Sequence, residues 1–75
     1  MNPRTFLARE ADLHDIVAHV ETCGAALALP RALVLRLCLV VEELFVNSAR
    51  HGGAAEASIA LAAATDGIWL HYVDD

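Results

Sequence analysis

A carboxylate, a carboxamide and a guanidinium follow one another at helical spacing in the middle of the chain. Glu43 and Asn47 are four residues apart, and Arg50 and His51 extend the series by one more turn. Residues at this spacing share one face of a helix. They suit a magnesium–phosphate site, because an amide oxygen can ligate a hard cation and a guanidinium can pair with phosphate oxygens. The carboxylate can take a proton from a hydroxyl nucleophile.

The same series is also typical of a solvated helix face with no chemical role. Glu42 is rotated by about 100° from Glu43 around the helix and is expected to be solvated. Ser48 has no histidine–acid pair placed to activate it as a nucleophile, so we expect a small packing residue. The four histidines are scattered, and no pair of them has a spacing typical of zinc ligands.

The series lies on a predicted helix from about Arg31 to Arg50. Pro30 suits the first turn of a helix, where its missing N–H is not needed, and the two glycines after His51 are typical of a helix end. The apolar spacing predicts that one face of this helix is buried. That face is expected to contain Leu33, Leu37, Val40, Val41, Leu44 and Ser48.

Four further elements are predicted to position this helix. In chain order they are an edge strand over residues 4–8, a helix from Glu10 to about Leu27 that Gly24 weakens near its end, and strands over 57–64 and 68–73 that Asp66-Gly67 joins as a hairpin turn. The order β-α-α-β-β, with two helices on one face of an antiparallel sheet, predicts an α+β two-layer sandwich.

The last predicted strand is aromatic and β-branched, and it ends directly in Asp74-Asp75. Trp69 and Tyr72 are expected to pack on the helices or across strands, with a partner surface as the alternative. Natural domains rarely end on an acidic pair directly after such a strand. We therefore expect the chain to be part of a larger domain.

Composition narrows the class of protein. With 75 residues the chain holds one domain at most, and with 57% hydrophobic residues it is too apolar for a disordered segment. The net charge of −5 argues against a nucleic-acid backbone or an anionic membrane as partner. The apolar run over residues 32–41 is shorter than the ~20 residues that span a bilayer, and residues 1–5 lack the layout of a signal peptide. We expect a cytoplasmic protein in which Cys23 and Cys38 are reduced core thiols.

The string LVVEELFVNSARHG, residues 39–52, resembles the N-box of the histidine-kinase-like ATPases. Its form is closest to the branch of bacterial anti-sigma factors and serine kinases. The strand end Val73-Asp74-Asp75 resembles the start of the next motif of these ATPases, Asp-x-Gly-x-Gly, cut before its glycines. The resemblance covers nearly the whole chain but only about half of the ATPase domain. It identifies residues 1–75 as a partial domain that lacks the glycine motifs and the lid.

The resemblance implies a role for five residues. Glu43 would be the general base, Asn47 would ligate the magnesium that bridges the phosphates, and Arg50 would reach a phosphate. His51 would pack beside the nucleotide. Asp74 would accept a hydrogen bond from the adenine amino group.

The resemblance also implies a function for the intact parent, which would be an ATP- and magnesium-dependent protein serine/threonine kinase that regulates transcription. It would phosphorylate an anti-sigma antagonist protein, hold a sigma factor and form a homodimer. The short chain itself is expected to bind ATP poorly or not at all. Two alternatives stay open: a nucleotide-free interaction module that dimerises through an open sheet edge, and the ATPase domain of a sensor histidine kinase.

Overall fold

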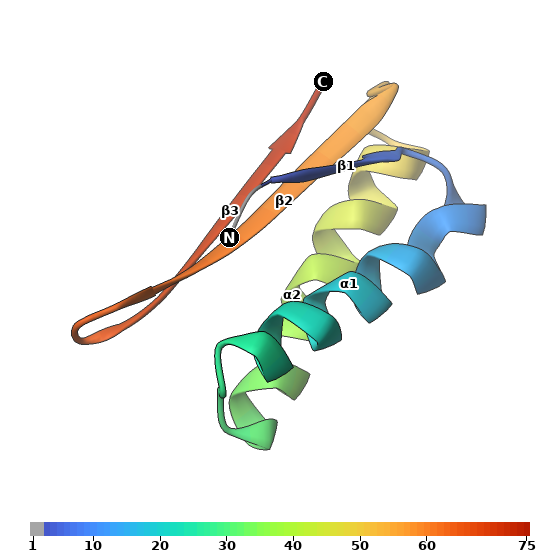
Figure 1. The fold of residues 1–75 in the computed structure, drawn as a ribbon. Helices are drawn as coiled ribbons and strands as arrows, with labels where there is room; N and C mark the ends of the chain where they lie inside the picture. Colours follow the sequence, from blue (N-terminus) through green and yellow to red (C-terminus); the bar gives the residue numbers. More distant parts are fainter. Residues whose placement is uncertain (1–2) are drawn as a thin grey trace.

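Two helices cover one face of a three-stranded antiparallel sheet in the computed structural model, which describes residues 3–75 (Figure 1). The elements in chain order are β1 (Arg4–Leu7), a short 3₁₀ turn η1 (Glu10–Asp12), α1 (Leu13–Ala26), α2 (Arg31–Arg50), β2 (Glu56–Ala64) and β3 (Gly67–Asp74). This arrangement confirms the expected α+β two-layer fold. Met1 and Asn2, which belong to the segment considered for a signal peptide, lie outside the described residues.

The sheet has the strand order β1-β2-β3, so β1 is an edge strand as predicted. β1 pairs with the first part of β2, from Leu7 opposite Glu56 to Arg4 opposite Ile59. β2 is the central strand and also pairs with β3 along nearly its whole length, from Ala57 opposite Asp74 to Ala64 opposite Gly67, the last pair before the hairpin turn. The tip of this hairpin extends beyond the helices (Figure 1). The predicted hairpin is confirmed, although Gly67 begins β3 and does not belong to the turn.

The core lies between the helices and the inner face of the sheet. Strand residues alternate between the two faces, which places Phe6, Ile59 and Leu61 toward the helices with exposed fractions of 7%, 1% and 1%. Helix α1 contributes Ile16 and Val20, as its apolar spacing predicts. These side chains form one continuous apolar cluster with the buried face of α2.

The buried face of α2 is rotated from the predicted one. The buried residues are Val34, Leu37, Cys38, Val41, Phe45 and Ser48. The prediction that Val40 is buried is wrong, because its side chain is 47% exposed. Helix α2 packs against α1 as well as against the sheet, so its buried stripe extends to the side that faces α1. The sequence pattern alone could not show this second neighbour.

Gly24 lies where α1 packs closely against Val34 of α2. A Cβ atom at Gly24 would lie 2.6 Å from Cγ2 of Val34, which is far inside van der Waals contact. The sequence indicates Gly24 only as a weak point of the first helix. In the structure the missing side chain of Gly24 lets α2 pack close to α1. This packing explains why a residue that weakens the helix stands at position 24.

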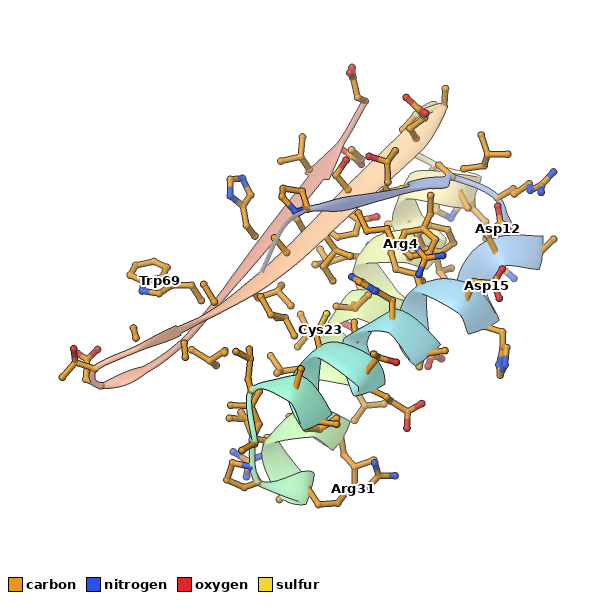
Figure 2. All side chains as sticks on the ribbon, in the orientation of Figure 1. Arg4, Asp12, Asp15, Cys23, Arg31 and Trp69 are labelled. Atoms are coloured by element: carbon orange, nitrogen blue, oxygen red, sulfur yellow. The ribbon has the colours of Figure 1, made fainter. Side chains whose placement is uncertain are left out.

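Trp69 lies on the face of the sheet that points away from the helices (Figure 2). It stands opposite Ala62 on β2 and is 71% exposed, so of the two expected placements it takes the one across strands and does not pack on the helices. Tyr72, three residues later, is half-buried and packs against the core, as expected. The two aromatic residues of β3 therefore belong to opposite faces of the sheet.

Cys23 and Cys38 are buried free thiols, as predicted, and burial raises the pKa of each. Cys23 lies between α1 and the sheet (Figure 2), with its Sγ 3.4 Å from Nε2 of His19. Burial lowers the pKa of His19, which favours the neutral ring. Within residues 3–75, neither helix combines the length and the hydropathy that a bilayer crossing requires.

Candidate functional site

The exposed face of α2 carries a hollow of about 340 Å³. Its lining consists of Glu42, Glu43, Val46 and Asn47. Glu43 and Asn47 therefore share one surface feature, as their spacing of four residues predicts. Glu42 is exposed, as expected, but it also borders the hollow.

The donor groups around this hollow suit a magnesium–phosphate ligand. Mg²⁺ binds oxygen ligands and commonly keeps several waters, with one or two protein side chains and substrate phosphates completing its shell. Asn47 supplies one exposed amide oxygen, and the Glu43 carboxylate is one turn away. Among residues 3–75, no group of three or more His, Cys, Asp or Glu side chains is placed to hold a metal ion.

Behind this face, Ser48 connects α2 to the end of β3. Its Oγ lies 2.8 Å from Oδ2 of Asp74 and 2.7 Å from the hydroxyl oxygen of Tyr72. Ser48 is 2% exposed, which agrees with the expected packing residue. The hydrogen bonds of Ser48 to Tyr72 and Asp74 were not predicted from the sequence. The signal that could have found it is the spacing of Tyr72 and Asp74, which places both side chains on one face of a strand.

The end of α2 packs tightly against this hydrogen-bonded group. The N–H groups of His51 and Gly52 both donate to the carbonyl oxygen of Asn47, at 2.9 and 2.8 Å. A Cβ atom at Gly52 would lie 3.2 Å from Cα of Ser48 and 3.4 Å from Oδ2 of Asp74. The predicted helix stop is confirmed. Gly52 also lets the chain turn close beside Asp74.

Arg50 forms an ion pair with Glu10 of η1. Its Nε and Nη2 atoms donate to the two carboxylate oxygens, the second bond being 3.3 Å long. This hydrogen bond, and then the charge of the guanidinium, lowers the pKa of Glu10. This partner could not be predicted from the sequence, because 40 residues separate the two side chains.

The predicted site residues thus fall into three places. Glu43 and Asn47 line the hollow, Asp74 is bonded to Ser48 on the same helix, and Arg50 is turned toward Glu10. His51 is exposed at the end of α2, where it caps the helix through its backbone. Sequence and structure together therefore centre the candidate site on the C-terminal half of α2 and the end of β3.

The chain is similar to the sensor histidine kinase LnrJ of Bacillus subtilis (strain 168). The two are 44% identical over 60 residues, which make up 80% of this chain and 15% of that kinase. The chain therefore spans a small part of the length of the relative it matches. No protein-family model matches the chain, and no solved structure matches it. The similarity is consistent with a relation to the histidine-kinase-like ATPases, and the relative is a histidine kinase rather than an anti-sigma kinase.

Proposed function

We propose that the chain carries the N-box part of a kinase-type ATP-binding domain. The observation that supports this most strongly is the 2.8 Å hydrogen bond between Ser48 and Asp74. It holds the carboxylate proposed for the adenine beside the helix that bears Asn47, the residue proposed for the metal. Two groups that are 27 residues apart in sequence are thereby brought to one end of the fold.

In the proposed site each side chain has one task. Asn47 would hold a magnesium ion through its amide oxygen, and that ion would supply positive charge beside the phosphates. Glu43, exposed one turn earlier, accepts the proton of the attacking hydroxyl or water. Asp74 accepts a hydrogen bond from the amino group of the base. His51 lies beside the nucleotide at the end of α2.

Arg50 can serve such a site only by exchanging partners. Its guanidinium pairs with Glu10, and both side chains are 55% exposed. Exposed ion pairs contribute little to stability, so a phosphate with its larger charge competes well for the guanidinium. We propose that Arg50 leaves Glu10 when a nucleotide phosphate is present.

The form of the N-box string favours a parent of the anti-sigma type. That parent transfers the terminal phosphate of ATP to a serine of an antagonist protein, holds a sigma factor and acts as a cytoplasmic homodimer. The 44% identity to a sensor histidine kinase favours the second candidate, the ATPase domain of such a kinase. Both candidates require the same ATP site, so the site can be tested before the parent is known.

The test is equilibrium binding of a fluorescent ATP analogue to the chain, with and without Mg²⁺. The sequence predicts weak ATP binding or none for residues 1–75, and the proposal requires the weak binding. Saturable binding that needs Mg²⁺ and is lost in Asn47→Ala supports the proposal. The matched control is Glu21→Gln, a surface change on α1 that leaves the site intact. A folded chain that binds no analogue, or an Asn47→Ala variant that binds as well as the wild type, contradicts it.

A further inference from the structure

The Ser48 hydroxyl has more acceptors nearby than it has protons. Three oxygen atoms lie within hydrogen-bond distance of its Oγ: the Tyr72 hydroxyl at 2.7 Å, Oδ2 of Asp74 at 2.8 Å and the Leu44 carbonyl at 3.0 Å. A serine hydroxyl has a single proton to donate and two lone pairs with which to accept. Only a few arrangements of donors and acceptors are therefore possible among these four oxygen atoms.

Charge decides where the Ser48 proton goes. A carboxylate is a stronger acceptor than a neutral carbonyl, and the Leu44 carbonyl already accepts the backbone N–H of Ser48 in the helix. The proton therefore points to Asp74. The Tyr72 hydroxyl then donates to Ser48, and its distance of 2.7 Å is typical of an O–H···O bond.

The resulting chain has its most buried member, Ser48, in the middle and ends at the surface with Asp74. Ser48 is 2% exposed, Tyr72 is half-buried and Asp74 is exposed. Oδ2 of Asp74 is occupied by Ser48, whereas Oδ1 has no hydrogen-bond partner among residues 3–75. The backbone of Gly52 passes close to Oδ2, since a Cβ atom at Gly52 would lie 3.4 Å from that oxygen.

We propose that Ser48 and Tyr72 are positioning residues that orient the Asp74 carboxylate and set the base selectivity of the site, an inference that rests on the proposed ATP-binding function. The hydrogen-bond chain donates in one direction, from Tyr72 through Ser48 to Asp74. It leaves Oδ1 of Asp74 as a fixed acceptor. An amino group of a nucleobase can donate to that oxygen, whereas a base carbonyl at the same place would face it with a second acceptor.

The first arm of the test needs no nucleotide. It follows the NMR signal of the Asp74 side-chain carboxyl carbon in the full chain at neutral pH. Ser48→Ala removes the donor and is expected to move this signal clearly, and Tyr72→Phe, which removes only the second hydroxyl, is expected to move it less. The control is Ser58→Ala, because Ser58 bonds Thr5 at 2.9 Å on the other face of the sheet.

Ser48→Thr keeps the hydroxyl and is expected to retain the wild-type signal. A signal that Ser48→Ala leaves unchanged in a folded chain overturns the positioning role. Should Ser48→Ala fail to fold, Tyr72→Phe decides in its place, and an unchanged Asp74 signal in that variant overturns the chain of donors.

The second arm measures competition of ATP and GTP against the fluorescent ATP analogue. The wild type is expected to prefer ATP, and Ser48→Ala is expected to reduce the ATP-to-GTP affinity ratio about tenfold, as loss of a hydrogen bond to a charged group allows. Ser48→Thr should restore the ratio. Equal losses for both nucleotides overturn the selectivity claim. If the wild type binds neither nucleotide, the proposed function fails and selectivity with it, while the carboxyl signal still decides whether Ser48 positions Asp74.

Discussion

Glu10 and Arg50 are 40 residues apart in sequence and form a two-point ion pair that ties the start of the first helical segment to the end of α2. A second pair, Glu21 with Arg31 at 3.5 Å, links the same two segments near the opposite end of α2. Ion pairs therefore bracket the contact between the helices, and the apolar side chains between them form the core. The Glu10–Arg50 pair is the one that touches the candidate site.

The Glu10–Arg50 pair makes stability depend on pH in a defined direction. Because Arg50 lowers the pKa of Glu10, the contribution of the pair is present at neutral pH and is lost as the pH falls through that lowered pKa. Glu10→Gln is therefore expected to lower the melting temperature slightly at neutral pH and to have no effect in strong acid. Thermal denaturation followed by circular dichroism at both pH values checks this.

Two controls separate the pair from a general charge effect. High salt should shrink the difference between wild type and Glu10→Gln, since both side chains are half exposed and open to screening. Glu21→Gln should have a smaller effect, because its contact with Arg31 is longer. A melting difference that persists unchanged in acid speaks against the ion pair.

Gly24→Ala is expected to destabilise the protein, although alanine is the better helix former by about 1 kcal/mol. The added methyl group would lie 2.6 Å from Val34, and overpacking of this kind costs about 1–3 kcal/mol. Urea denaturation of the variant measures the change in the free energy of unfolding.

The double variant Gly24→Ala/Val34→Ala gives the decisive comparison. Val34→Ala removes the two methyl groups that the new Cβ would meet, so the double variant should be less destabilised than the sum of the single variants. Additive losses would mean that the helices do not approach each other at Gly24.

The rotation of α2 predicts unequal effects for Phe45 and Val40. Phe45 is fully buried, so Phe45→Ala should cost about 3–5 kcal/mol, a large share of the stability of a domain this small. Val40 is 47% exposed, so Val40→Ala should change the free energy of unfolding by about 0.5 kcal/mol or less. If the two variants lost similar amounts of unfolding free energy, Val40 would be buried, as the sequence pattern predicts.

Both cysteines are expected to react with a thiol reagent only when the protein unfolds. Cys23 and Cys38 are 1% and 9% exposed, and burial raises the pKa of both, so little thiolate is present at neutral pH. Colorimetric thiol labelling should be slow in buffer and fast in denaturant for both residues. Rapid labelling of either thiol in the folded protein would show that its helix does not pack as described.

The order of elements could be predicted because each has a local signal. Pro30 and the glycines after His51 bracket α2, and the predicted range Arg31 to Arg50 agrees with the observed helix. The aromatic and β-branched residues of the last strand and the Asp66-Gly67 turn signal indicate the hairpin. The rotation of α2 and the reason for Gly24 could not be predicted, because both depend on where the second helix lies in space.

In the candidate site, too, local features could be predicted from the sequence and contacts between distant segments could not. The shared face of Glu43 and Asn47 follows from helical geometry and is confirmed by the hollow that both line. The partners of Asp74 and Arg50 could not be predicted, since each contact joins segments that the fold alone brings together. The roles of these residues toward a nucleotide stay predictions.

The proposed function requires that a nucleotide binds on the C-terminal half of α2, beside the end of β3. Titration of the labelled chain with ATP in the presence of Mg²⁺, followed by NMR, tests this claim residue by residue. We expect saturable shifts over residues 43–52 and 72–74, including the side-chain amide of Asn47, and we expect these shifts to disappear without Mg²⁺. A spectrum that does not change, or shifts centred on the outer sheet face around Trp69, would contradict it.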